Sequence, residues 1–275
     1  DTEQMRPDGI SGWKMTLETS FFETRLATDE TDLLAVQRLR YRVFVEELGG
    51  DGALVDHERR LERDEFDPVV DQMILVDNRR SRDALDHVVG VYRLLPGDRA
   101  QSFGRFYCDS EYDLTSLRNS GRSLLEMGRS CVDPAFRGGA GLMLLWSALA
   151  EYVLSRDIDI LFGVASFHGT DVASLAQPLS WLHHNHLAPE ALRPVARPDG
   201  FQRMDLIAKE DLDRRAAMLG MPPLIKAYLR LGGTVGEGAF LDRPFNTTDV
   251  LLMMDTALMS AKHRDFYTAR WQTNG

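Results

Sequence analysis

The stretch LLEMGRSCVDPAFRGGAGLMLLWSALAEYVL, residues 124–154, decides the fold that the sequence predicts. It contains a short apolar strand, a turn through Pro134 and several glycines, and a long helix in which Leu145, Leu149 and Val153 share one face. The N-terminal N–H groups of such a helix point at the turn before it, where they can bind an anion. This order of elements therefore predicts a site at the turn.

The glycine loop RGGAG has two readings. Glycines let the backbone approach a phosphate and Arg137 adds a positive charge, but a simple connecting turn would use the same residues. The pattern alone slightly favours the simple turn, and it fits neither a P-loop nor a dinucleotide-binding fingerprint. A phosphate-bearing arm such as phosphopantetheine is the ligand that this loop could hold, through Arg137, Gly138, Gly139 and Gly141.

The rest of the chain predicts a mixed α/β domain. Thr28 is placed to cap a first amphipathic helix, and Pro178 is expected to interrupt a later one. Strands 72–76 and 87–96 should pair as antiparallel neighbours. The remaining predicted elements are a buried strand at 158–167, the interrupted helix at 170–187, a strand-like segment at 200–208, a helix at 222–233 and a strand at 247–255.

Composition bounds the class of protein. The 275 residues are 44% hydrophobic, which allows one continuous domain over residues 21–275 with a C-terminal extension, after a partly disordered tail at 1–20. A formal charge of −10 argues against nonspecific nucleic-acid binding. Cys108 and Cys131 have no metal-ligand spacing and form no disulfide framework. No apolar run could span a bilayer and no signal-peptide pattern is present, so we expect a cytoplasmic location.

An acidic cluster precedes the second predicted strand. LERDEFDPVVDQMILVDN, residues 61–78, places Glu62, Asp64 and Asp67 close together. Carboxylates at this spacing repel one another unless water or cations surround them. A solvated surface turn is the simple interpretation, and the rim of an active site that receives arginines from elsewhere is the sharper one.

Three other segments supply those arginines. Arg40 interrupts the apolar side of the first helix, and Arg93 lies within a predicted strand, where it needs a partner or a cleft. Glu126 and Arg129 face opposite sides of a regular strand, and a bulge between them would change that.

In this order, RYRVF, ERDEFD, YRLLP and EMGRSCVDPAFRGGAG resemble the acyl-homoserine-lactone synthase branch of the GNAT acyltransferase superfamily. The chain departs from these synthases at Gly49 and Gly50, where they carry a tryptophan, and this points away from S-adenosylmethionine as substrate. From about residue 21 it is similar to the bacterial L-ornithine Nα-acyltransferases that start ornithine-lipid synthesis. The residues that match the motifs by position are Arg40, Phe44, Glu62, Asp64, Asp67, Arg93, Glu126 and Arg129.

The resemblance implies a GNAT-like fold, in which a mixed central sheet is flanked by helices and two central strands splay apart to admit the acyl donor. The splayed strands would be 124–132 and 158–167. The phosphate of the donor's phosphopantetheine arm would lie on the glycine loop, and the backbone of Cys131 and Val132 would bind its amide. An N–H of the same edge would stabilise the developing oxyanion. No permanently bound cofactor and no metal are implied.

The implied reaction transfers a (3-hydroxy) fatty acyl group from acyl carrier protein to the α-amino group of ornithine, giving lyso-ornithine lipid by direct attack on the thioester. A base must take the amine proton, and Glu62, Glu126 and Asp64 are the catalytic candidates, with Asp64 the weakest. An ion-pair network or acceptor site would use Arg40, Asp67, Arg93 and Arg129. The alternatives are glutamine as acceptor, a homoserine-lactone synthase, and a noncatalytic module that binds acyl chains or a carrier protein.

Further residues have weaker assignments. Phe44, Ser166 and His168 are candidates to line the substrate path, while the histidines at 183, 184 and 186 fit an exposed helix end better than a metal site. The apolar face of helix 222–233 fits core packing, although a lipid product keeps peripheral contact with the inner membrane open. Because acyl carrier protein is acidic, we expect a basic patch at the entrance, containing Arg137 and Arg193 or Arg197.

Overall fold

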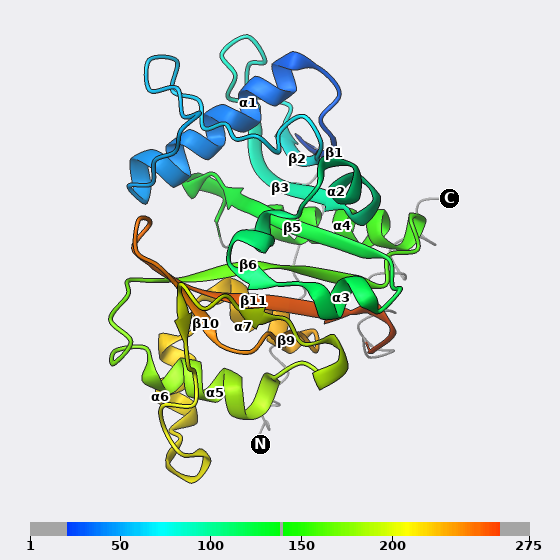
Figure 1. The fold of residues 1–275 in the computed structure, drawn as a ribbon. Helices are drawn as coiled ribbons and strands as arrows, with labels where there is room; N and C mark the ends of the chain where they lie inside the picture. The colour runs from blue at the N-terminus through cyan, green and yellow to red at the C-terminus, as the bar shows by residue number, and fades with distance from the viewer. Residues whose placement is uncertain (1–20, 138–139, 259–275) are drawn as a thin grey trace, which may run out of the picture.

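A mixed sheet organises the part of the chain that the computed structural model describes, residues 21–137 and 140–258. Within those residues nine strands form it, in the order β1-β2-β3-β5-β6-β11-β10-β8, with β9 paired to β11 (Figure 1). Every neighbouring pair in that order is antiparallel except β5 and β6, which α4 connects. These strands are β1 (Phe22–Leu26), β2 (Asp71–Asp77), β3 (Val88–Pro96), β5 (Leu124–Val132), β6 (Ile160–His168), β8 (Phe201–Gln202), β9 (Thr234–Val235), β10 (Ala239–Asp242) and β11 (Thr247–Asp255).

Helices cover both faces of this sheet, and a small ladder of β4 (Tyr112–Asp113) with β7 (Val195–Ala196) lies beside it. In Figure 1, α1 lies in the upper part of the view and α5 and α6 in the lower part. The helices are α1 (Glu30–Arg40), α2 (Gly97–Phe103), α3 (Thr115–Asn119), α4 (Ala140–Ser155), α5 (Ala176–His186), α6 (Arg214–Gly220) and α7 (Pro223–Arg230). A π-helical segment η2 (Tyr41–Glu47) follows α1, and short 3₁₀ turns are η3 (Tyr107–Ser110), η4 (Pro134–Phe136), η5 (Glu190–Leu192), η6 (Lys209–Asp211) and η7 (Thr256–Leu258).

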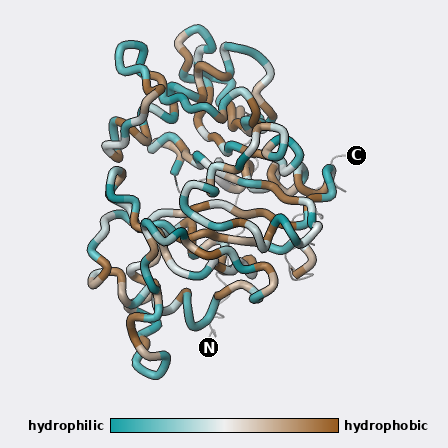
Figure 2. The backbone as a smooth tube through the Cα atoms, in the orientation of Figure 1, coloured by the Kyte–Doolittle hydropathy of each residue, from teal (hydrophilic) through white to brown (hydrophobic). Residues whose placement is uncertain are grey.

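Alternating side chains bury both faces of the sheet. On β2, Met73 and Leu75 join the cluster under α4 and α7, whereas Ile74 and Val76 join the cluster under α1. Burial on both sides explains why the central strands are nearly continuous apolar runs. Figure 2 shows the hydrophobic stretches along the central strands and hydrophilic residues mainly in the peripheral loops.

The first helix begins one residue later than expected. The side chain of Asp29, not that of Thr28, caps α1 by accepting a hydrogen bond of 2.8 Å from the Asp32 N–H. Thr28 instead donates its own N–H to the Asp32 carboxylate. After Arg40 the helix widens into π geometry, with Leu48 N–H bonded to Val43 C=O. Such wide turns occur often at functional sites.

The predicted strand at 200–208 is largely wrong. Only Phe201–Gln202 form β8, because the buried Ser180 of α5 binds the following backbone. Its hydroxyl donates to Met204 C=O and accepts from the N–H groups of Leu206 and Ile207. These backbone groups therefore form hydrogen bonds with a side chain and not with a neighbouring strand.

Three other predictions can be compared directly. The antiparallel pairing of β2 with β3 is confirmed, and so is the strand at 247–255, which is β11 between β6 and β10. Pro178 does not interrupt a helix, because α5 begins at Ala176 and places it in the first turn, where no N–H is needed. The tail at 1–20 lies outside the described residues. Among the described helices, none has the length and apolar character needed to cross a membrane.

Candidate active site

The parallel strands β5 and β6 separate after three residue pairs. Leu124, Leu125 and Glu126 pair with β6, and the partner of Glu126 is Phe162. Beyond this point β5 continues alongside β3 and β6 continues alongside β11. The splayed strands expected from the resemblance are therefore present. Gly163 lies at the apex, where an added Cβ atom would be 2.2 Å from the Met127 carbonyl oxygen.

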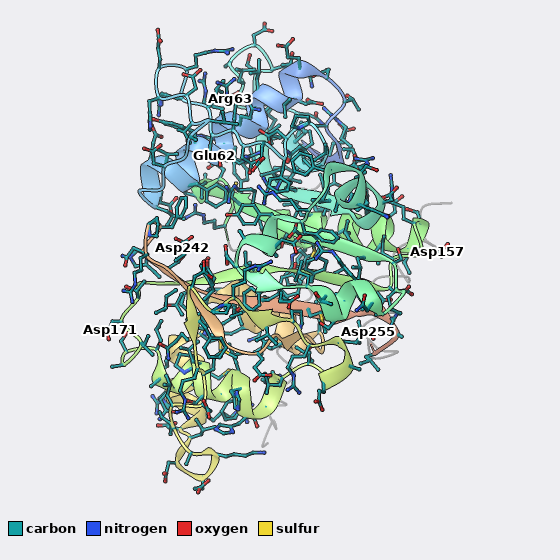
Figure 3. The ribbon with its side chains drawn as sticks, viewed as in Figure 1. Glu62, Arg63, Asp157, Asp171, Asp242 and Asp255 are labelled. Atoms are coloured by element: carbon teal, nitrogen blue, oxygen red, sulfur yellow. The ribbon has the colours of Figure 1, made fainter. Side chains whose placement is uncertain are left out.

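A cavity of about 840 Å³ opens at this splay. Glu62, labelled in the upper part of Figure 3, and Asp242, labelled at the left near the middle of the view, both line it. So do Phe44, Asp64, Arg93, Glu126, Arg129, Ser166 and His168 among the predicted site residues. Its apolar lining includes Tyr92, Met127, Ala165, Leu224, Tyr228 and Leu252. The fold thus gathers the acidic segment, two of the three arginines and the substrate-lining candidates around one space.

A β-bulge brings Glu126 and Arg129 to the same cavity. Gly128 lies opposite Arg93 and Cys131 opposite Val91, so β5 has one more residue than β3 over this stretch. Arg129 has φ of 47°, in the left-handed region that few side chains other than glycine adopt. The extra residue resets the alternation of the strand, as the Glu-x-x-Arg spacing requires.

Glu62 and Asp64 each bridge two arginines. Glu62 contacts Arg40 and lies 3.2 Å from Arg129 Nε, in an ion pair that lacks hydrogen-bond geometry. Asp64 contacts Arg93 and lies 3.6 Å from Arg129 Nη2. Burial opposes the ionisation of Asp64, but Arg93, Arg40 and Arg129 together hold its pKa below the usual value. Asp64 is therefore a poor proton acceptor, and Glu62 is already neutralised by two cations.

Arg40 and Asp67 lie behind the cavity wall and do not line it. Arg40 is fully buried, and its Nη1 is 2.5 Å from the Asp67 carboxylate. Gln37 and Gln72 donate side-chain hydrogen bonds to the same carboxylate, at 3.1 and 3.3 Å. This pair therefore connects α1, β2 and the acidic segment.

Glu126 is held differently from the other acids. It is 4% exposed, and its two carboxylate oxygens accept hydrogen bonds from the backbone N–H groups of Cys108 and Tyr107, at 2.7 and 2.9 Å. Burial raises the pKa of Glu126 despite these hydrogen bonds. Of the three predicted catalytic acids, Glu126 has the environment that suits a base.

Among the described residues, the predicted donor-binding residues Cys131, Val132, Arg137 and Gly141 lie outside the cavity lining. The Cys131 side chain packs under α1, and burial raises its pKa to about 12, so any donor contact at Cys131 involves its backbone. Arg137 is bound by the exposed Glu47 carboxylate at 2.6 and 2.7 Å, and its Nε donates to Val132 C=O. Gly141 is buried against Leu75, and Gly138 and Gly139 lie outside the described residues.

The histidines and the distant arginines are held locally. His183, His184 and His186 are half-buried at the end of α5, and His184 Nε2 is 2.9 Å from Ile207 C=O. Arg193 Nε donates to Ala188 C=O and Arg197 Nε to Asp109 C=O, whereas Arg137 binds η2. These arginines are thus anchored to different segments.

A second acidic cluster was missed in the sequence. Oxygen atoms of Glu111, Asp242 and Asp249 all lie within 4.8 Å of one another and line the cavity. These residues follow η3, end β10 and lie within β11, so no local spacing joins them. Burial, together with Asp249 and Asp242, raises the pKa of Glu111 to about 9. The one hint in the sequence was Asp249 itself, a charged residue directly before the apolar run 250–254 of the predicted strand.

Comparison with known proteins agrees with this site. An acetyltransferase (GNAT) domain model matches residues 39–147. An L-ornithine Nα-acyltransferase of Rhodobacter capsulatus is 68% identical over 254 residues, which cover 92% of this chain and 97% of the relative. The chain belongs to the L-ornithine Nα-acyltransferase family. The family member from Brucella abortus is 38% identical, with coverage of 90% of this chain and 89% of the relative.

Solved structures give the same fold for this L-ornithine Nα-acyltransferase family member. The CoA-dependent acyl-homoserine lactone synthase BjaI superimposes with a TM-score of 0.50 at 16% identity, covering 93% of this chain and 90% of the other. FeeM, an N-acyl amino acid synthase from uncultured soil microbes, has a TM-score of 0.50 at 14% identity, covering 86% and 92%. The predicted GNAT-like fold and the resemblance to this family are therefore confirmed, and the chain is an N-acyltransferase.

Proposed function

We propose that the protein transfers a (3-hydroxy) fatty acyl group from acyl carrier protein to the α-amino group of ornithine, forming lyso-ornithine lipid. The observation that carries this proposal is the cavity at the β5–β6 splay, which combines Glu126, Arg93, Arg129 and an apolar lining. The family relationship supports ornithine as the acceptor. The apolar side chains from β3, β5, β6, α7 and β11 suit an acyl chain.

The α-amine of ornithine attacks the thioester carbonyl carbon. Glu126 accepts a proton from the amine, because its buried carboxylate has a raised pKa and lies at the last paired residue of the splay. A backbone N–H on the free edge of β5 stabilises the oxyanion. The new N–C bond then forms the amide, the C–S bond breaks, and the phosphopantetheine thiolate leaves and takes up the proton.

The environments of the two cysteines favour direct attack of the amine on the thioester over transfer through an acyl-cysteine. Both are buried, and burial raises the pKa of each thiol. A buried, protonated thiol is a weak nucleophile, so neither is suited to carry the acyl group between donor and acceptor. Arg93 or Arg129, which line the cavity, bind the α-carboxylate of the acceptor.

Mass spectrometry tests this function. Purified protein is mixed with 3-hydroxyacyl carrier protein and with ornithine or glutamine, and fragmentation of the product locates the new amide. Acylation at the α-nitrogen of ornithine is expected. A glutamine product would change the acceptor, and binding of the donor without any acylated amino acid would instead support a noncatalytic module.

A further inference from the structure

The cluster of Glu111, Asp242 and Asp249 has acceptor atoms without donors. Glu111 is 5% exposed and Asp249 is 4% exposed. Glu111 Oε2 and Asp249 Oδ1 are buried and have no hydrogen-bond partner. Asp242 is half-buried and accepts one hydrogen bond of 3.2 Å from the Phe245 N–H. Unpaired buried carboxylate oxygens are costly, which indicates that a ligand supplies the missing donors.

No cation of the described chain neutralises this cluster. Every salt bridge of the described residues involves other carboxylates. Of the arginines that line the cavity, Arg93 and Arg129 are paired with Glu62 and Asp64, Arg63 with Asp56 and Arg105 with Glu65. Arg129 favours ionisation of Glu111, and it does so from the neighbouring ion-pair network. The cavity therefore has an arginine-rich side and a purely acidic side.

From this arrangement we infer that Glu111, Asp242 and Asp249 form the subsite for the side-chain ammonium group of the acceptor amino acid. The inference rests on the proposed function. It explains why the enzyme would prefer an acceptor with a basic side chain. The arginine side would bind the α-carboxylate, Glu126 would face the α-amine, and the acidic cluster would bind the far ammonium. Residues of all three groups, the arginines, Glu126 and the acidic cluster, line the same cavity.

The chemistry of an ammonium group matches the cluster. It carries one positive charge and three N–H donors. The three carboxyl groups, within 4.8 Å of one another, offer an acceptor oxygen for each donor, and the bound cation favours the ionised form of Glu111. Such charge-assisted hydrogen bonds are strong in a desolvated site. Glutamine would place a neutral amide there, which brings no charge to offset the carboxylates. The cluster therefore discriminates between ornithine and glutamine by charge.

An acceptor series tests the subsite in the wild-type protein. Norvaline is ornithine without the side-chain amine, so it keeps the reacting groups and loses only the proposed contact. With 3-hydroxyacyl carrier protein as donor, we expect kcat/KM for ornithine to exceed that for norvaline by roughly tenfold to a hundredfold. Equal values would overturn the subsite but leave the transfer reaction intact. Acylation of neither amino acid would instead contradict the proposed function.

Two isosteric variants then locate the contact. Glu111→Gln and Asp249→Asn should each reduce the ornithine-to-norvaline ratio of kcat/KM toward one. Asp77→Asn is the matched control, because Asp77 is 2% exposed, lies on β2 outside the cavity and should leave the ratio unchanged. An unchanged ratio in both test variants, with folding confirmed by circular dichroism, would contradict the assignment.

A metal ion is the competing occupant, since three carboxylates can also bind Ca²⁺ or Mg²⁺. Titration calorimetry with calcium chloride, magnesium chloride and ornithine, each alone, separates the two. We expect heat from ornithine that Asp249→Asn reduces, and none from either salt. Metal binding that disappears in Asp249→Asn would overturn the ammonium subsite.

Discussion

Gly163 on β6 lies directly against Met127 on β5. A Cβ atom at Gly163 would be 2.2 Å from the Met127 carbonyl oxygen, far inside van der Waals contact. Glu126 immediately precedes Met127, and its partner Phe162 immediately precedes Gly163. The glycine therefore lets the strands stay paired up to the residue that we propose as the base, and then separate.

Gly163→Ala should widen the apex of the splay. The added methyl group must displace backbone, and we expect a loss of unfolding free energy of about 1–3 kcal/mol, with a fall in kcat because Glu126 moves relative to the thioester. Urea unfolding and steady-state kinetics measure both effects. Gly52→Ala is a suitable control for stability, because its Cβ would lie 3.5 Å from Val55, an ordinary contact. A Gly163→Ala protein with unchanged stability and kcat would contradict this account.

Glu126→Gln should remove the base. We expect kcat to fall roughly 10²- to 10⁴-fold, while the variant still binds the acyl donor. The raised pKa of Glu126 also predicts how kcat/KM depends on pH. Because the base acts when ionised, kcat/KM should rise with pH through a pKa above the usual glutamate value, and the variant should lack this limb. A pH profile that keeps the limb in Glu126→Gln would assign the base to another residue.

Asp67→Asn tests whether Asp67 contributes to stability and not to catalysis. The substitution leaves Arg40 buried with one fewer negative partner, so the unfolding free energy should fall by about 3 kcal/mol. Since Asp67 does not line the cavity, kcat per folded molecule should stay within about threefold of the wild-type value. Chemical denaturation and kinetics at low temperature test the two parts. A catalytic loss as large as that of Glu126→Gln in a stable protein would reverse the assignment.

Glu111 should destabilise the free protein as pH rises. Its folded pKa of about 9 exceeds the unfolded value of a glutamate, because burial and the carboxylates of Asp249 and Asp242 outweigh Arg129. Folding therefore favours the protonated form, and this stabilisation, complete below the unfolded pKa, is lost between about pH 4.5 and about pH 9. At about pH 8, Glu111→Gln should unfold at a higher temperature than the wild type, by roughly 2–4 °C or more. A lower melting temperature would indicate a structural role.

The salt bridge of Arg137 with Glu47 gives a prediction about the carrier protein. Glu47→Gln should release a positive charge near the glycine loop and lower KM for acyl carrier protein, whereas Arg137→Glu should raise it, each by about tenfold or less. A short pantetheine thioester tests specificity, because its KM should change little in either variant. Equal effects on both donors would show that Arg137 does not contact the carrier.

Much of the catalytic side of the cavity could be predicted from sequence. Local motifs contain Glu62, Asp64, Arg93, Glu126 and Arg129. The spacing within each motif is a local property and does not depend on how the rest of the chain folds. The bulge could be anticipated for the same reason, since Glu126 and Arg129 lie on one strand. The prediction of a strand at 200–208 was largely wrong, because the local sequence contains no information about Ser180. This residue lies in a separate helix and binds the same backbone.

The sequence by itself determined the family, the GNAT-like sheet and the residues of the ion-pair lattice, because periodicity and motif spacing are properties of contiguous residues. Only the tertiary structure decided which residues share the cavity. It placed Arg40 and Asp67 behind the wall, Glu126 on two backbone N–H groups, and Glu111, Asp242 and Asp249 together. The physical reason is that β11 pairs with β6 across nearly eighty residues of chain, and no local pattern encodes that register.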